Sequence, residues 1–348
     1  MKFIHIADVH LGAIPDAGKV WAKEREKEIW ETFEKIVPIC NNERADLLLI
    51  SGDLFHRQPL KKELKEVNYI LSKLVQTQVV IIAGSYDYLK ESSRYLDFEW
   101  HENIHFLTNT QMDKVYFPLI DTEVWGLSYN RPQITEALYD EVSVKKDRTY
   151  RILMAYGGDE NHIPMKLNQL AQKEFHYIAL GYFHTPKLFE QQRMAYSGAL
   201  EPIEKSETGK HGYIIGEILE DGTKISFVPI AKREYVSLKV TMTADTTNQE
   251  LKERIQSVIE ECGDNNIYKV IIEGKHDSDK KVEVAQLFEI GNVLEVIDKT
   301  VPEYNLLAIY NEHKEDIIGK YMEALQAMPA SETNQKALFY GLEALMSD

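Results

Sequence analysis

The chain has 348 residues, of which 44% are hydrophobic and 10% aromatic. This length indicates a large domain with a smaller one attached, and the hydrophobic content excludes a disordered protein. The net charge of −16 argues against a broad basic surface for nucleic acid, although it allows a local basic patch and is compatible with acidic metal sites.

The sequence contains no targeting signal that we recognise. It enters a strand-like run at once, with no basic segment followed by an apolar one and no uninterrupted apolar stretch long enough for a membrane helix. Cys40 and Cys262 stand alone, without metal-binding or redox spacing, as expected of reduced thiols. We therefore expect a cytoplasmic protein without a membrane segment.

The N-terminal third alternates short apolar runs with amphipathic stretches. The apolar runs predict buried parallel strands, and the amphipathic stretches predict helices between them. The strands are expected at Phe3–Ala7, Leu47–Ser51 and Val79–Ala83, and the helices at Val20–Asn41 and Lys62–Gln76.

From Lys114 onward the pattern changes to shorter strands separated by turns. These strands are expected at Val115–Leu119, Val124–Leu127, Arg151–Ala155, Tyr177–Leu180, Tyr213–Leu219 and Lys224–Val228. Asp221-Gly222 predicts a hairpin turn between the last two. The mixture predicts an α/β fold in which two mixed β-sheets pack face to face with helices outside.

A first domain is thus expected over residues 1–233, followed by a small α/β domain over 234–304. Thr247 and Glu250 have the spacing of a capping box at the start of a helix. A strand is predicted by the alternating apolar residues Val236, Leu238, Val240 and Met242, and further elements are expected at Tyr268–Glu273 (strand), Glu283–Glu289 (helix) and Leu294–Ile297 (strand).

The remaining residues, 305–348, form a tail that we predict to be helical after Glu312. Its apolar stripe consists of Ile317, Ile318, Tyr321, Met322 and Leu325. Pro329 interrupts the pattern, and Ser331 can cap a last helix. Packing on its own protein is the simpler role for this tail, and docking of a partner is the alternative.

Polar residues follow the ends of five predicted strands, which is where open α/β sheets place their ligands. The segments are Asp8-Val9-His10, Gly52-Asp53-Leu54-Phe55-His56, Gly84-Ser85-Tyr86-Asp87, Tyr156-Gly157-Gly158 and Gly181-Tyr182-Phe183-His184. Carboxylate oxygen and imidazole nitrogen both suit Mn²⁺, Fe²⁺ or Zn²⁺. In this order and at these positions, they predict a metal centre.

These motifs resemble those of the calcineurin-like metallophosphoesterases and, within them, the SbcD-type DNA-repair nucleases. That family carries D-x-H-L-G, G-D-L-F-[DH], G-N-H-D, a later His-Gly and G-H-x-H. The segment Tyr196–Glu201 followed by Gly212-Tyr213 resembles the part that closes its nuclease domain. The resemblance implies phosphodiester hydrolysis by two metals about 3.5–4 Å apart, bridged by one aspartate. It also implies a DNA-capping role for 234–304 and an ATPase-docking role for 305–348.

The resemblance divides the ligands between the two metals. It assigns the first metal to Asp8, His10, Asp53 and His184, all of which are present. The second metal would use Asp53 together with an asparagine and two histidines, and those three positions are here Ser85, Tyr156 and Tyr182. Every unshared ligand of the second metal is therefore replaced, while the first set is complete.

The resemblance also implies catalytic roles around the metals. The histidine of G-N-H-D, which assists phosphate transfer or protonates the leaving group, is here Tyr86. Asp87, which is expected to orient that group, and His56, which helps to place the DNA backbone in relatives, are both retained. Loss of a general acid commonly removes about 10²- to 10⁴-fold in rate.

These replacements predict one divalent ion rather than two. Manganese is the first expectation, with iron or zinc as alternatives. A tyrosine phenol has a pKa of about 10 in water and binds a metal well only when deprotonated. We expect Tyr156 and Tyr182 to fill an empty second site as core aromatics, and Fe³⁺ held by tyrosinate is the alternative.

The other polar residues have simpler interpretations. The remaining histidines are expected to be structural or on the surface: His5, His101, His105, His162, His176, His211, His276 and His313. Lys61, Lys62 and Lys65 suit either contact with a DNA backbone or a solvated helix face.

Two classes of function stay open at this point. The first is a metal-dependent DNA phosphodiesterase of the exonuclease type that works with an SbcC-type coiled-coil ATPase, weakened by the replaced ligands. The second is an inactive subunit that keeps one structural metal and serves as a DNA- or ATPase-binding scaffold. A small phosphodiester or nucleotide hydrolase is a third hypothesis, which the resemblance of the C-terminal part disfavours. Relatives also imply a homodimer.

Overall fold

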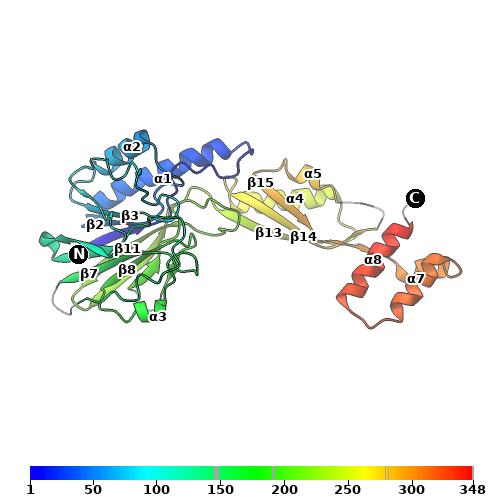
Figure 1. Ribbon diagram of the computed structural model, residues 1–348. Helices are drawn as coiled ribbons and strands as arrows, with labels where there is room; N and C mark the ends of the chain where they lie inside the picture. The colour runs from blue at the N-terminus through cyan, green and yellow to red at the C-terminus, as the bar shows by residue number, and fades with distance from the viewer. Residues whose placement is uncertain (145–148, 190–192, 279, 281, 347–348) are drawn as a thin grey trace. The chain divides into compact units, whose positions relative to one another are not determined.

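A computed structural model describes all residues except 145–148, 190–192, 279, 281 and 347–348 (Figure 1). The chain separates into two compact units, Met1–Tyr235 and Val236–Asp348. In the part of the chain described, no helix has the length and apolar character needed to cross a bilayer.

The first unit contains two mixed sheets that face each other. The first sheet has the order β12-β11-β1-β2-β3-β4. Its members are β1 (Lys2–Ile6), β2 (Leu47–Ser51), β3 (Gln78–Ile82), β4 (Ile104–Phe106), β11 (Gly212–Leu219) and β12 (Gly222–Pro229). Strands β1 to β4 are parallel, whereas β11 runs antiparallel to β1.

The second sheet has the order β5-β6-β7-β8-β10-β9. Its members are β5 (Asp113–Phe117), β6 (Thr122–Gly126), β7 (Tyr150–Tyr156), β8 (Tyr177–Gly181), β9 (Lys187–Leu188) and β10 (Met194–Tyr196). Strands β6, β7 and β8 are parallel. The buried core between the sheets includes Phe3, Leu49, Leu153 and Tyr177.

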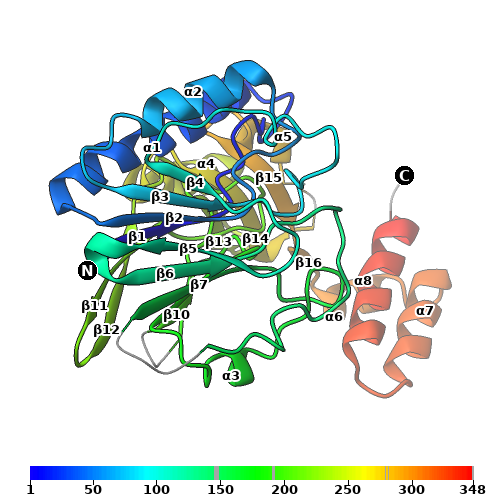
Figure 2. The same cartoon turned by 60° about the vertical axis from the view of Figure 1, so that its left-hand side comes forward.

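Helices cover the outer side of the first sheet, as Figure 2 shows for α1 (Ala22–Glu43) and α2 (Lys61–Leu71). Ile29 and Phe33 of α1 and Leu64 of α2 are fully buried in the core beneath them. Two short helical segments, η1 (Pro118–Ile120) and α3 (Leu167–Leu170), lie between strands of the second sheet. The two mixed sheets with flanking helices confirm the fold class expected from the sequence.

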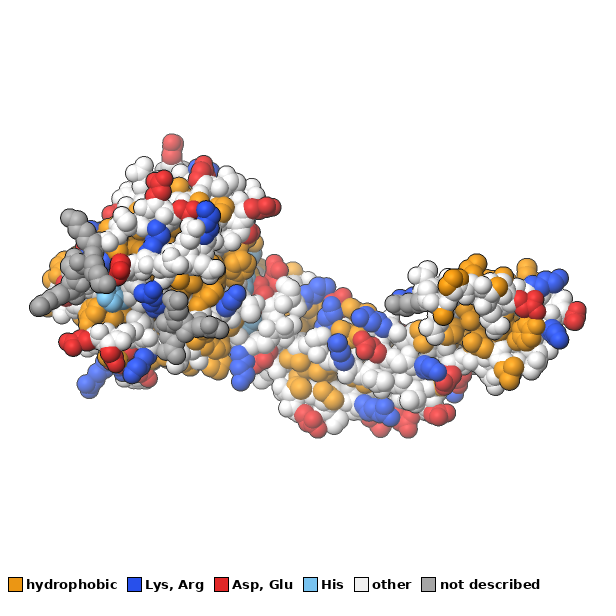
Figure 3. All heavy atoms as spheres, turned by 90° about the horizontal axis from the view of Figure 1, so that it is seen from below, with side chains coloured by type: hydrophobic (Ala, Val, Ile, Leu, Met, Phe, Trp, Pro, Cys, Tyr) orange, Lys and Arg blue, Asp and Glu red, His pale blue; other side chains and the backbone are white. Residues whose placement is uncertain are grey.

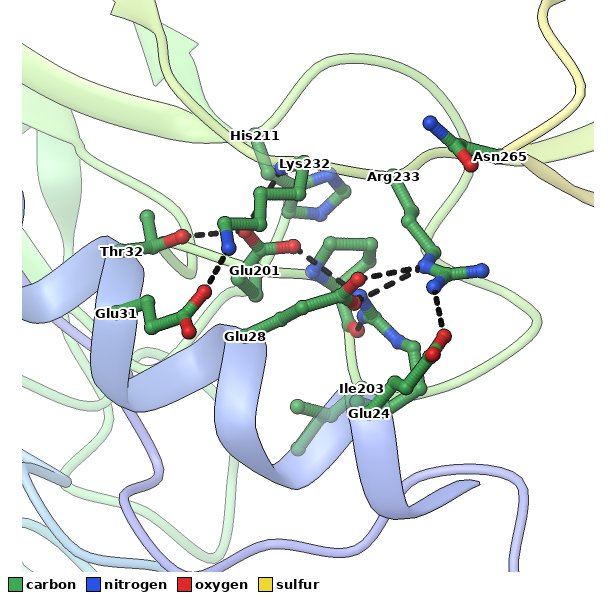
Figure 4. Close-up of polar contacts among 12 residues, drawn as sticks. Glu24, Glu28, Glu31, Thr32, Glu201, Ile203, His211, Lys232, Arg233 and Asn265 are labelled. Atoms are coloured by element: carbon green, nitrogen blue, oxygen red, sulfur yellow. Dashed lines mark hydrogen bonds and ion pairs between the residues drawn. The ribbon is translucent and has the colours of Figure 1, made fainter. Parts of the chain in front are cut away.

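A buried ion cluster fixes α1 to the end of the first unit (Figure 4). The Arg25 side chain is fully buried and donates to Glu28 over 2.8 Å and to Glu201 over 3.3 Å. Glu201 also accepts from the Thr32 hydroxyl over 2.6 Å, and Arg233 donates to Glu28 over 2.9 Å. Because a buried charge is costly without a partner, this cluster holds the segments around residues 201 and 233 against α1.

The second unit combines a small sheet, whose strands are connected through two helices, with three further helices at the C-terminal end. Its strands are β13 (Tyr235–Met242), β14 (Ile267–Asp277), β15 (Val293–Asp298) and β16 (Val301–Glu303). Its helices are α4 (Asn248–Cys262), α5 (Val284–Leu287), α6 (Leu306–Glu312), α7 (Ile317–Gln326) and α8 (Glu332–Met346). Thr247 and Glu250 form the predicted capping box at the start of α4.

Some boundaries differ from the sequence prediction. Helix α2 ends at Leu71 rather than Gln76, because the chain must turn back to pair Gln78 with Leu47. The predicted helix at Glu283–Glu289 is a single turn in which only Leu287 is buried. Helix α6 was not predicted. Since Leu219 pairs with Gly222, the hairpin turn lies one residue earlier than expected.

Candidate metal centre

The carboxyl ends of the parallel strands bring the predicted site residues to one edge of the two sheets. Asp8 follows β1 and Asp53 follows β2, with left-handed φ values of 50° and 47°. The two loops are joined by hydrogen bonds from the Asp8 N–H to the Gly52 carbonyl (3.1 Å) and from the His10 N–H to the Asp53 carbonyl (3.0 Å). Strained backbone of this kind clusters at functional sites, where the surrounding structure holds it in place.

The residues assigned to the first metal meet at this edge. One ligand atom each from Asp8, His10 and His184 lies within 4.8 Å of the others. The His10 and His184 Nε2 atoms are 3.1 Å apart, and Asp53 Oδ2 lies 4.0 Å from His10 Nε2. The structure thus brings together all four residues, with Asp53 just outside the tightest group of three.

Glu207 orients His184 through Nδ1, the ring nitrogen that does not face His10. Its Oε1 lies 2.6 Å from His184 Nδ1, and its Oε2 accepts a hydrogen bond from the Ile203 N–H over 2.7 Å. A carboxylate on the far nitrogen of a histidine leaves the other nitrogen directed into the site, as at many metal centres. Sequence reasoning missed Glu207, because it lies in a loop and matches no motif.

The electrostatics of this group favour a cation. Burial raises the pKa of Asp8 to about 6, although the charge of His184 opposes this shift. Burial, followed by the charges of Asp87 and Asp8, raises the pKa of Asp53 well above its usual range. Burial acts to lower the pKa of His184, but its hydrogen bond to the Glu207 carboxylate and the Asp8 charge raise it to about 9. Crowded carboxylates that resist ionisation are the groups whose charge a divalent ion would stabilise.

We call the residues assigned to the first metal, Asp8, His10, Asp53 and His184, the first half of the centre. This first half fits a divalent metal. Its donor set of two carboxylates and two imidazoles is complete, and both Nε2 atoms face each other. When bound, such an ion would supply Lewis-acid polarisation of a phosphoryl oxygen.

The second half of the centre consists of Asp53 and the three replaced positions, Ser85, Tyr156 and Tyr182. Tyr156 fills the space beside Asp53. Its side chain is 1% exposed, and its hydroxyl donates to Asp53 Oδ2. Ser85 Oγ lies 3.0 Å from the same hydroxyl. The tyrosine ring also lies directly on Gly52, where an added Cβ would come within 2.2 Å of Tyr156 Cδ2. The ring and its hydroxyl thus close the space beside Asp53.

Tyr182 is engaged by a different set of residues. Its hydroxyl donates to Asp159 Oδ2, and its ring stacks on His162 with 4.7 Å between ring centroids. His162 Nδ1 lies 2.8 Å from Asp159 Oδ1. The sequence placed His162 among the structural or surface residues, and neither it nor Asp159 carried a motif that would have linked them to this site.

The second half does not fit a second cation. A serine hydroxyl is a poor neutral ligand, and a phenol binds a metal well only when it is deprotonated. Burial, followed by the charges of Asp53 and Asp8, raises the pKa of Tyr156, and burial with the Asp159 hydrogen bond raises that of Tyr182. This disfavours binding of Fe³⁺ by tyrosinate and favours the tyrosine-filled interpretation.

His56 and Tyr86 lie beside the first half. The His56 and His10 Nδ1 atoms are 3.2 Å apart. The Tyr86 N–H donates to Asp53 Oδ1 over 2.8 Å, and the Tyr86 ring stacks on His56 at 5.0 Å with 28° between the planes. Tyr86 is 46% exposed, in contrast to Tyr156.

Asp87 lies beneath these residues and is buried. It accepts hydrogen bonds from the Gly84 N–H (2.9 Å), the Phe55 N–H (3.2 Å) and the Tyr95 hydroxyl (2.8 Å). Its hydrogen bonds thus hold the loops after β2 and β3 together. The Asp87 carboxylate makes no hydrogen bond to the Tyr86 side chain among the described residues.

Comparison with known proteins places this chain in a family. A model of the calcineurin-like phosphoesterases matches residues 1–192. The chain is 26% identical over 315 residues to the DNA double-strand break repair protein Mre11 of Sulfurisphaera tokodaii, covering 84% of this chain and 78% of that protein. It is 27% identical over 272 residues to Mre11 of Methanocaldococcus jannaschii (69% of each chain). It is 24% identical over 287 residues to Mre11 of Sulfolobus acidocaldarius (74% and 72%).

The resemblance to metallophosphoesterases and to SbcD-type repair proteins is thereby confirmed. The family model covers strands β1 to β9 of the two sheets, but not β10 to β12, and all of the candidate metal centre except Glu207. The chain belongs to the calcineurin-like phosphoesterase family.

Proposed function

We propose that this protein is a one-metal DNA-repair subunit that binds DNA together with an SbcC-type coiled-coil ATPase and has weak or no two-metal nuclease activity. The observation that carries the proposal is the hydrogen bond from the Tyr156 hydroxyl to Asp53. By resemblance, Asp53 would bridge two metals, and here one of its oxygens is engaged by a side chain that replaces a ligand. The Mre11 relatives are named for repair of DNA double-strand breaks, which supports DNA as the ligand.

Residual phosphodiesterase activity is the second candidate. It is favoured by the intact group of Asp8, His10 and His184 and by the retained His56, whose Nδ1 lies 3.2 Å from His10 Nδ1. Loss of the general acid removes about 10²- to 10⁴-fold in rate, and loss of one Lewis-acid metal removes several kcal/mol more of transition-state stabilisation. Any such hydrolysis should therefore be slow.

Metal content measured together with nuclease activity tests the proposal. The wild type should bind one Mn²⁺ per chain, with Fe²⁺ or Zn²⁺ as alternatives, and should cleave DNA barely or not at all. Restoring the family ligands with Ser85→Asn, Tyr86→His, Tyr156→His and Tyr182→His should add a second ion. The control that adds Asp53→Asn to these four changes should lose both ions, because Asp53 contacts both sets of residues. Brisk wild-type cleavage that falls in Tyr156→Phe would refute the proposal.

The ATPase partner is proposed to dock on the C-terminal helices. Leu307 is 73% exposed, and Ile317 and Tyr340 are each 69% exposed. Figure 3 shows hydrophobic side chains gathered over this part of the second unit. Exposed apolar patches of this kind mark sites of protein association. The segment 234–304 is correspondingly proposed to cap DNA, and a homodimer is proposed as the assembly.

Truncation tests the docking proposal. Removal of residues 312–348 should leave the first unit folded and abolish co-purification with an SbcC-type protein, because it removes α7 and α8 together. Retained co-purification would place the docking site elsewhere and leave the tail with a packing role.

A further inference from the structure

Two tyrosines that stand at motif histidine positions of the family differ in their exposure and in the groups that they bring to Asp53. Tyr156 is 1% exposed, and its hydroxyl is bound by Asp53 and Ser85, so the closed second half explains it. Tyr86 is 46% exposed and contributes its backbone N–H, rather than its hydroxyl, to Asp53. Closure of the second half therefore does not explain why a large aromatic ring stands at position 86.

The Tyr86 ring is held in a defined orientation. One face stacks on His56 at 5.0 Å and 28°, and the ring meets His10 edge to face at 5.0 Å and 85°. The backbone of Tyr86 is anchored to buried Asp53 over 2.8 Å. A ring fixed in this way loses little conformational freedom when a second flat group stacks on it.

A second exposed ring flanks the same centre. Phe183 is 44% exposed and precedes His184 in the chain. The rings of Tyr182 and Tyr196 brace it edge to face, each with a centroid distance of 5.0 Å. Tyr182 holds this turn in a left-handed backbone with φ 108°, where its N–H donates to both oxygens of Asp8. Strain of this kind at a bulky residue requires support from its surroundings and is a feature of ligand sites.

We propose that Tyr86 and Phe183 stack on unpaired bases of single-stranded DNA held at the metal centre. The inference rests on the proposed DNA-binding function and names the form of DNA that this site takes. Every nucleobase offers a flat π-face, whereas the base pairs of an intact duplex hide theirs, so exposed rings select single strands.

The surrounding charges favour a base over a phosphate at Tyr86. The carboxylates of Glu204 and Glu207 act on its hydroxyl and would repel a phosphate there. Basic side chains lie instead at the start of α2, where Lys61, Lys62 and Lys65 are exposed. Both observations are consistent with a strand that stacks a neutral base on the rings and directs its sugar–phosphate backbone toward α2.

Equilibrium binding of a fluorescein-labelled oligothymidylate of about 15 nucleotides tests the inference, since one single-strand module covers a site of about this size or less. The comparison oligonucleotides are an abasic strand and a duplex of the same length, each measured with Mn²⁺ and with EDTA. Tyr86→Leu should weaken binding of the base-containing strand by about 5- to 150-fold, the loss that corresponds to one base–aromatic stack. Phe183→Leu should act in the same direction.

Two control variants separate stacking from general effects. Tyr86→Phe keeps the ring and should bind like the wild type. Tyr116→Leu removes a tyrosine of similar exposure (50%) from β5, where it pairs with Glu123 near the start of β6 and thus away from the strand ends that form the site. It should leave binding unchanged.

Unchanged binding by Tyr86→Leu and Phe183→Leu would overturn the stacking inference. Equal wild-type affinity for the abasic strand would do the same, and both results would leave the proposed DNA-binding function standing. Failure of the wild type to bind any of the three oligonucleotides would instead overturn both the inference and that function.

Discussion

The two halves of the metal centre lie at the same edge of the same sheets, yet they differ in what their side chains do. In the first half, His10 and His184 direct their Nε2 atoms at each other, and Glu207 holds His184 from behind. In the second half, Tyr156 and Tyr182 donate their hydroxyls to Asp53 and Asp159. The backbone scaffold is common to both, so the difference arises from side chains that either leave donor atoms directed into the site or engage them with hydrogen-bond partners.

Asp53 belongs to both halves, so its replacement should have the largest effect. Asp53→Asn removes a charged metal donor and places an amide opposite two hydrogen-bond donors, the Tyr156 hydroxyl and the Tyr86 N–H. We expect Mn²⁺ affinity to fall by more than about 100-fold, beyond the usual effect of a supporting residue. The melting temperature should fall as well, because bound metal at 100 times its Kd stabilises a fold by about 2.7 kcal/mol.

Calorimetric titration with Mn²⁺ and thermal unfolding with and without the metal measure these two effects. An Asp53→Asn variant with wild-type metal content would show that Asp53 is not a ligand. The two halves would then be independent.

Glu207 supports only the first half. Glu207→Gln keeps the shape of the side chain but weakens its hold on His184 Nδ1, which now lies 2.6 Å from a carboxylate oxygen. We expect Mn²⁺ to bind about 10- to 100-fold more weakly, as for other residues that support metal ligands. Calorimetry measures this change, and the metal-free protein should unfold at a lower denaturant concentration, because the largely buried His184 loses its carboxylate partner. Glu204→Gln in the same loop is the matched control and should bind Mn²⁺ normally.

Tyr156→Phe tests the second half alone. The ring remains and should keep the space closed, but Asp53 loses a buried hydrogen-bond donor. We expect a loss of about 2 kcal/mol in the free energy of unfolding of the metal-free protein, since an unsatisfied buried group costs about 1–3 kcal/mol. Denaturant unfolding measures this, and the metal content should stay at one ion. A gain of a second ion would mean that the hydroxyl rather than the ring closes this half.

The smallest effect is expected for Tyr182→Phe. Its hydroxyl bonds Asp159 at a partly exposed position, so water can replace the lost partner. We expect a loss of about 0.5–1 kcal/mol in the free energy of unfolding, the net value of an ordinary hydrogen bond. A loss equal to that of Tyr156→Phe would show that both tyrosines belong to one buried network.

The sequence alone determined the strands, the main helices and the order of the site residues. Short, continuous apolar runs such as Leu47–Ser51 predict strands buried on both faces, and residues that follow parallel strands must share one edge of a sheet. That reasoning placed Asp8, His10 and Asp53 together without coordinates, whereas His184 follows β8 of the second sheet and meets them because the two sheets pack face to face. It failed at element ends such as that of α2, where tertiary pairing rather than periodicity sets the boundary.

Only the tertiary structure decided what the replaced residues do. Nothing in the sequence spacing links Glu207 to His184 or Asp159 to Tyr182, because these contacts join loops that approach each other only when the sheets have formed. The exposures of Tyr86 and Tyr156 are likewise opposite, although both tyrosines replace a motif histidine. The burial of a side chain depends on the space that its neighbours leave after folding. The Tyr156 ring, for example, fits because Gly52 beneath it has no side chain. The local sequence does not encode that space.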